Sequence, residues 1–176
     1  SELFIIEQSN FPEKIISGWH SIPEEQFDFS FSKLRLEVKS STTESRTHHF
    51  SSGQLNPSNG TEILIASILV NTNVAGVSVK DLIKKISKKS NIFPKQKEKL
   101  HLLAFSTIGS DIEQIENIKF NYELAKESLR FYKSEEVPKI NDVNIPVEVS
   151  KVKFVSNLIN SEPLQMNVDS LLKEEL

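Results

Sequence analysis

The chain has 176 residues, a formal net charge of −3 at pH 7 and no cysteine. Its length suits a single domain, and its 38% hydrophobic and 26% charged fractions are those of an ordinary globular protein. The absence of cysteine excludes disulfides and thiolate zinc sites. The most apolar run, Ile63 to Val70, is too short to cross a bilayer, which takes about 20 residues, and no signal peptide opens the chain. We therefore expect a cytoplasmic protein that makes no contact with membranes.

The first eight residues already have the apolar pattern of a buried helix, and the only methionine is Met166. We therefore expect the chain to lack an upstream N-terminal part of a longer protein. A second short helix is predicted from Pro12 to Trp19, with the proline in its first turn.

The clearest β signal runs from Phe27 to Ser40. Apolar and polar residues alternate on both sides of a two-residue break at Ser32–Lys33, which is the pattern of a β-hairpin. Counting outward from that turn pairs Phe29 with Leu36. One face of the hairpin is then entirely apolar, and it consists of Phe27, Phe29, Phe31, Leu34, Leu36 and Val38.

The other face of the hairpin carries charged residues. The same register sets Asp28 opposite Glu37, with Cβ atoms about 4.5 to 5.5 Å apart, and puts Lys39 on that face two residues further along. Two carboxylates this close repel each other unless a cation binds between them or one takes up a proton. Mg²⁺ binds one or two carboxylates and fills its other positions with water. A solvent-facing hairpin with one charged face is the plainer alternative, although directly opposed acids are unfavourable there.

Later segments have simpler patterns. The continuous apolar run from Glu62 to Val70 predicts a central strand buried on both faces. Ser78 can cap an amphipathic helix, and a second helix is expected from Pro94 to Ser106. Shorter elements are predicted as strands over 47–50, 117–124, 129–136 and 151–158, and as one helical turn over 51–55.

Eight lysines lie between Lys80 and Lys99, against two acids. A basic block on an otherwise acidic protein is either a phosphate-facing patch or a solvated helix face, and both interpretations stay open. The candidates for phosphate contacts are Lys84, Lys85 and Lys88.

The spacing of Asp28, eight intervening residues and Glu37-Val38-Lys39 resembles the signature of the PD-(D/E)xK nuclease superfamily. Further segments resemble a restriction-associated branch of PD-(D/E)xK motif proteins, similar to components encoded beside DNA methyltransferases in bacterial defence systems. These segments are Ser1 to Glu7, Trp19-His20, Phe27-Asp28-Phe29, Leu36 to Ser41, Arg46 to Ser51, Gln54-Leu55 and Leu129 to Tyr132.

The resemblance implies an α/β fold: a restriction-endonuclease-like core with a central mixed β-sheet flanked by helices. It would cover residues 1–158. The chain beyond Asn160 is polar with few large apolar residues, so we expect a loosely ordered C-terminal tail over 159–176. The implied activity is Mg²⁺-dependent hydrolysis of double-stranded DNA, with Mn²⁺ able to substitute. The implied partners, besides DNA, are a second copy of the chain or other subunits of a restriction system.

The resemblance also implies roles for individual residues. Asp28 and Glu37 would bind the metal, assisted by Glu2 on the helix before the core, and Lys39 would be catalytic. Phe27 stands before Asp28 where the superfamily pattern has proline.

Other polar residues around the hairpin are open to two interpretations. Arg35 either contacts a phosphate or pairs with Glu37, and Gln54 is a candidate for the mouth of the site. Only one of His48 and His49 can face the site, because neighbouring residues on a strand point to opposite faces. The rival hypothesis for the whole chain is a non-catalytic module that binds DNA or a partner on the same fold.

Overall fold

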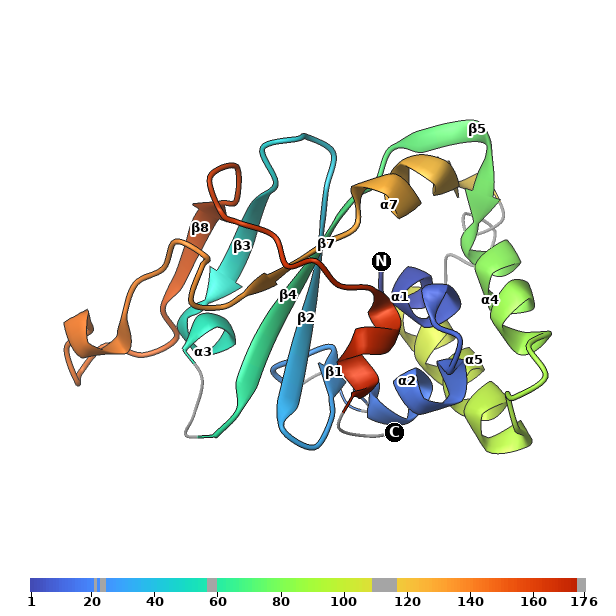
Figure 1. Cartoon of the computed structure of the whole chain (residues 1–176), viewed down its shortest axis with the longest axis horizontal. Helices are drawn as coiled ribbons and strands as arrows, with labels where there is room; N and C mark the ends of the chain where they lie inside the picture. Colours follow the sequence, from blue (N-terminus) through green and yellow to red (C-terminus); the bar gives the residue numbers. More distant parts are fainter. Residues whose placement is uncertain (21, 23–24, 57–59, 109–116, 174–176) are drawn as a thin grey trace.

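A mixed four-stranded sheet forms the centre of the protein in the computed structural model (Figure 1), which describes residues 1–20, 22, 25–56, 60–108 and 117–173. Its order is β1-β2-β4-β7, in which the central pair β2–β4 is parallel and both outer pairs are antiparallel. The strands are β1 (Phe29–Ser30), β2 (Leu34–Ser41), β4 (Glu62–Leu69) and β7 (Arg130–Lys133). The predicted α/β class with a mixed sheet is confirmed.

The predicted hairpin register is also confirmed. Phe29 pairs with Leu36 and Ser30 with Arg35 in β1–β2, and the Phe31 amide donates to the Leu34 carbonyl across the turn. Asp28 lies one residue before β1 and Glu37 one residue after Leu36, so the same register brings these two acids next to each other.

Helices cover one face of the sheet (Figure 1). They are α1 (Glu2–Gln8), α2 (Pro12–Gly18), α4 (Val79–Ser87) and α5 (Pro94–Ile108). They share the larger hydrophobic core with Phe29 and Leu36 of the hairpin. Phe27, predicted on the same face, packs instead against a second, smaller core. As predicted, Ser78 caps α4: its hydroxyl accepts from the Asp81 amide at 3.1 Å. No helix among the described residues is long and apolar enough to cross a membrane.

A two-stranded ribbon lies on the opposite side of the sheet (Figure 1). It pairs β3 (Thr47–Ser51) with β8 (Lys153–Asn157), and the short helix α3 (Ser52–Leu55) follows β3. Strand β4 is buried on both faces because Leu64 and Ala66 enter the helix-side core while Ile63 and Ile65 enter a smaller core under the ribbon. This two-sided burial explains its continuous apolar sequence.

Two segments differ from their predicted structure. The strand expected over 117–124 is only β6 (Lys119–Phe120), and helix α7 (Tyr122–Ser128) begins directly afterwards. The Asn121 side chain starts that helix by accepting from the Leu124 amide at 3.1 Å. Strand β5 (Thr72–Ser78), which pairs with β6, was not predicted because its first residues are exposed and lack an apolar alternation.

The C-terminal segment is packed, not loosely held as expected over 159–176, as far as residue 173. It contains the 3₁₀ helix η2 (Val168–Leu172), whose Leu171 and Leu172 are buried in the helix-side core. The other short 3₁₀ helix, η1 (Asp142–Asn144), lies earlier in the chain, before β8. Asp169 accepts hydrogen bonds from the Ser9 hydroxyl at 2.7 Å and the Asn10 amide at 2.9 Å, in the loop between α1 and α2. This polar segment docks because three of its few apolar residues, Val168, Leu171 and Leu172, are buried in the helix-side core.

Candidate active site

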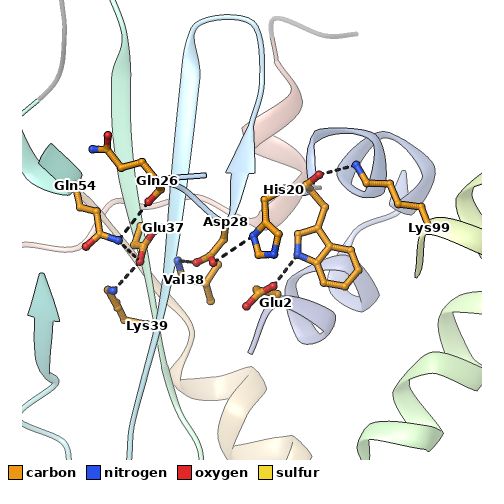
Figure 2. A network of polar contacts seen from close by, with 10 residues as sticks. Glu2, His20, Gln26, Asp28, Glu37, Val38, Lys39, Gln54 and Lys99 are labelled. Atoms are coloured by element: carbon orange, nitrogen blue, oxygen red, sulfur yellow. Dashed lines mark hydrogen bonds and ion pairs between the residues drawn. The ribbon is translucent and has the colours of Figure 1, made fainter. Parts of the chain in front are cut away.

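The first half of the site consists of Glu37 and Lys39, on the face of β2 that looks toward the ribbon (Figure 2). The Glu37 side chain is only 7% exposed, and its Oε1 lies 2.6 Å from the Lys39 Nζ. The ammonium of Lys39 also lies 5.3 Å from the centre of the Phe50 ring on β3, a distance at which a cation is attracted to the ring face. The predicted acid and lysine therefore form a close, half-buried ion pair.

Gln54 holds Glu37 from the other side. Its Nε2 donates to Glu37 Oε1 at 2.6 Å and to the Gln26 carbonyl at 3.3 Å. Its Oε1 accepts from the Ser51 amide at 2.9 Å, as part of the capping box that begins α3. One side chain thus fixes both the start of a helix and the orientation of a candidate catalytic carboxylate.

The second half of the site joins Glu2, His20 and Asp28 (Figure 2). One ligand atom from each side chain can be chosen such that all three lie within 4.8 Å of one another. Asp28 Oδ1 lies 3.8 Å from His20 Nδ1, and Asp28 Oδ2 accepts from the Val38 amide at 2.7 Å. That amide is available because β1 does not extend back beyond Phe29, so the aspartate side chain takes the place of a strand partner.

Trp19 positions Glu2. Its indole Nε1 donates to Glu2 Oε2 at 2.6 Å, its ring stacks on Phe29, and its carbonyl accepts from Lys99 Nζ at 2.5 Å. The tryptophan is buried in the core, and it also fixes the carboxylate that the sequence resemblance assigned to the metal site.

The two central carboxyl groups are poorly suited to carry charge where they stand. Burial, and next the charge of Glu2, raise the pKa of Asp28 to about 6. Burial, and next the charge of Asp28, raise the pKa of Glu37 to about 7, against an opposing effect of Lys39. Each carboxylate is therefore destabilised by burial and by the negative charge of a neighbouring carboxylate.

This donor set fits a divalent cation. Glu2, Asp28 and Glu37 offer the carboxylate oxygens that Mg²⁺ and Mn²⁺ prefer, and a cation among them would offset the burial and the repulsion that raise the pKa values of Asp28 and Glu37. Glu37 is not among the three residues that meet within 4.8 Å; its Oε1 is engaged by Lys39 and Gln54. The structure thus gathers the predicted ligands Asp28 and Glu2 most tightly and brings in His20 beside them.

The residues predicted to contact DNA lie in three different places. Arg35 donates to the Phe31 and Leu34 carbonyls of the hairpin turn, the latter at 3.0 Å; its guanidinium is thus directed to the turn and not to Glu37. Gln54 is in the site. The three lysines are exposed on α4 or directly after it, and this helix lies beyond α1 from the sheet (Figure 1). Lys84 and Lys85 belong to α4, and Lys88 follows its last residue. Within that basic block, Lys89 and Lys99 instead donate to backbone carbonyls at the ends of α1 and α2.

His48 and His49 point to opposite faces of β3, as predicted. His49 is exposed, whereas His48 is buried with its Nε2 2.8 Å from the Ser67 hydroxyl. Arg46 donates to the same hydroxyl at 2.9 Å, so that hydroxyl is left to donate to the histidine. Burial, and then the charges of Lys39 and Arg46, lower the pKa of His48 to about 4. His48 is thus a neutral structural residue that ties the ribbon to β4.

Fold and site together define a restriction-endonuclease-like protein. A mixed sheet is flanked by helices, and Asp28, Glu37 and Lys39 stand where the register of the hairpin predicts them. A family model described as "Putative PD-(D/E)XK family member, (DUF4420)" matches residues 1–159, and the chain belongs to that family. No curated protein and no solved structure matches the chain.

Sequence reasoning did not assign a role to His20 or Gln26. His20 stood out in the sequence only as part of a Trp-His pair that resembles the family. The number of residues between His20 and Asp28 does not match the spacing of a metal-binding sequence motif. Its position depends on a backbone contact, the His20 amide donating to the Asp28 carbonyl at 2.9 Å, which an amino-acid pattern does not reveal.

Proposed function

We propose that this protein is a Mg²⁺-dependent endonuclease that hydrolyses phosphodiester bonds in double-stranded DNA, in a bacterial restriction or defence system. The observation that carries the proposal is the grouping at β2. The buried Glu37 and the partly buried Asp28, whose carboxyl groups have raised pKa values, stand beside Lys39, whose Nζ is 2.6 Å from Glu37 Oε1. Membership of a PD-(D/E)XK family supports the nuclease class. The restriction setting follows from the sequence resemblance.

Asp28, Glu2 and Glu37 are the residues that would hold Mg²⁺, and Mn²⁺ would be able to substitute. The bound cation would supply positive charge to the scissile phosphate and acidity to a water molecule.

The other polar side chains of the site would act on the phosphate or hold the residues that do. Lys39, supported on the Phe50 ring, would donate to a phosphate oxygen and offset the negative charge that builds up in the pentavalent transition state. Gln54 would keep the Glu37 carboxylate in one orientation. Arg35 and the lysines of α4 would contribute phosphate contacts that position the duplex without reading its sequence.

The test is incubation of methylated and unmethylated plasmid with the protein and Mg²⁺, followed by electrophoresis. We expect nicked or linear product that EDTA suppresses. Lys39→Met should abolish cleavage, because it keeps the hydrocarbon stem over Phe50 and removes only the charge. Lys39→Ala should behave in the same way, with little loss of fold. The matched control is Lys33→Ala, which removes an exposed lysine at the turn of the same hairpin.

Cleavage by Lys39→Met at the wild-type rate would make Lys39 a structural residue and refute the catalytic assignment. If the wild-type protein bound DNA in a gel-shift assay but cut neither plasmid with Mg²⁺ or Mn²⁺, the rival hypothesis of a non-catalytic binding module would replace the nuclease.

A further inference from the structure

The imidazole of His20 has no place in the proposed chemistry so far, although it stands against the proposed metal ligands. We infer that His20 is a metal ligand, so that Glu2, His20 and Asp28 form a mixed nitrogen and oxygen site that favours Mn²⁺ over Mg²⁺. This inference rests on the proposed function for the cation site itself, and adds to it a ligand and a metal preference.

The distances suit a shared cation. Two ligands of one six-coordinate ion stand about 3.0 Å apart when adjacent and about 4.2 Å apart when opposite, given metal–ligand distances near 2.1 Å. His20 Nδ1 and Asp28 Oδ1 are 3.8 Å apart, which is within that range and too long for a direct hydrogen bond. All three ligand atoms lie within 4.8 Å of one another, so side-chain adjustments of less than about 1 Å bring them to one ion.

The backbone around the three residues fixes them in place before any ion binds. The His20 amide donates to the Asp28 carbonyl at 2.9 Å, and Trp19 forms a bridge with Phe29, so the segment of His20 continues the edge of the sheet. One oxygen of Asp28 is held by the Val38 amide, and one oxygen of Glu2 by the Trp19 indole. Each carboxylate therefore has one oxygen fixed by a surrounding partner and a second oxygen that can bind a cation, which is how ligands of a metal are held by surrounding partners.

An imidazole ligand changes which metal the site selects. Mg²⁺ keeps to oxygen ligands and water, whereas nitrogen ligands suit transition metals, and Mn²⁺ accepts both kinds. The preference for Mn²⁺ should therefore depend on His20, while the weaker affinity for Mg²⁺ should depend on the carboxylates alone.

The experiment measures binding of the metal alone to the whole chain, without DNA. Calorimetric titration with Mn²⁺ and with Mg²⁺ gives the two affinities, and pulsed electron paramagnetic resonance of bound Mn²⁺ detects coupling to a directly bound ¹⁴N. His20→Ala should abolish the nitrogen coupling and lower the Mn²⁺ affinity at least about tenfold, and change Mg²⁺ affinity by less than about threefold. His49→Ala, which removes an exposed histidine on β3, should match the wild type in all three measurements.

Asp28→Asn separates this inference from the proposed function. If the wild type binds Mn²⁺ in an Asp28-dependent way but shows no nitrogen coupling, or if His20→Ala keeps the Mn²⁺ preference, the role of His20 is overturned and the carboxylate site stands. If the wild type binds neither metal, the cation site and the role of His20 are both overturned. Loss of coupling in His20→Ala alone, with its fold unchanged by circular dichroism, supports the inference.

Discussion

Replacing Glu37 with glutamine should flatten the dependence of stability on pH in the metal-free protein. The Glu37 carboxyl has a pKa raised from 4.5 to about 7, first by burial and then by the charge of Asp28. Between those two pH values the folded protein retains a proton that the unfolded chain has already released. The free energy of unfolding therefore falls as the pH rises through this window, and the loss is complete above about pH 7.

The magnitude follows from the difference between the two pKa values. At about 1.4 kcal/mol for each pKa unit, ionising Glu37 in the folded protein costs about 3 kcal/mol of unfolding free energy. Asp28, with its pKa raised from 3.8 to about 6, adds a loss of the same sign at slightly lower pH. The variant Glu37→Gln keeps a side chain of nearly the same shape and removes only its own share.

Urea unfolding in EDTA at pH 4.5, 5.5, 6.5 and 7.5 measures this effect, at one fixed ionic strength. The single, buried Trp19 gives a fluorescence signal from inside the core. Because the variant also leaves Lys39 without its ion pair, the slopes against pH are compared and not the absolute stabilities. Excess Mg²⁺ should restore stability to the wild type at pH 7.5, through binding to the folded state.

Parallel pH profiles for the wild type and Glu37→Gln would refute the reasoning, because they would mean that Glu37 ionises as easily in the folded protein as in the unfolded chain. A wild-type stability that rises from pH 4.5 to 7.5 would contradict it more directly, since that sign belongs to carboxylates stabilised by their surroundings.

Two further predictions concern regions outside the site. Reversing Lys84, Lys85 and Lys88 to glutamate should weaken DNA binding and lower the slope of log affinity against log salt by about 0.9 for each phosphate that the protein no longer neutralises, whereas Lys126→Glu on α7 should not. Equal slopes in a fluorescence anisotropy titration would leave the α4 lysines as a solvated face. Leu172→Ala should lower the free energy of unfolding by about 2 to 5 kcal/mol, because this leucine is fully buried. A decrease below about 1 kcal/mol in urea would mean that the C-terminal segment contributes little to the core.

The hairpin could be predicted in detail because several local rules agree on it. A two-residue turn fixes which residues face each other, and the alternation on both strands fixes which side is buried, so the pairing of Phe29 with Leu36 followed from the sequence. The cap of α4 at Ser78 was equally local. The proximity of Asp28 to Glu37 followed from the same count.

The failures are of two other kinds: one is a local capping signal that was not used, and the others depend on contacts between distant segments. The segment of helix α7 was predicted as a strand because a short apolar run is ambiguous between strand and helix, whereas in the structure Asn121 caps a helix there. The tail was expected to be loose because its polar composition conceals a few residues that meet the core, such as Leu172. His20 was missed because a residue from the loop after α2 joins the site only through tertiary packing.

The hydrogen bonds of Asp169 have a consequence for where the protein can be divided. This residue lies beyond the stretch that the family model matches, residues 1–159, yet it ties η2 to Ser9 and Asn10 at the end of α1. Cutting the protein at the family boundary would leave every proposed metal ligand in the polypeptide. It would also remove the hydrogen bonds that hold the C-terminal end of helix α1, on which Glu2 stands. The folded unit that carries the site is therefore longer than the sequence signature by which its family is recognised.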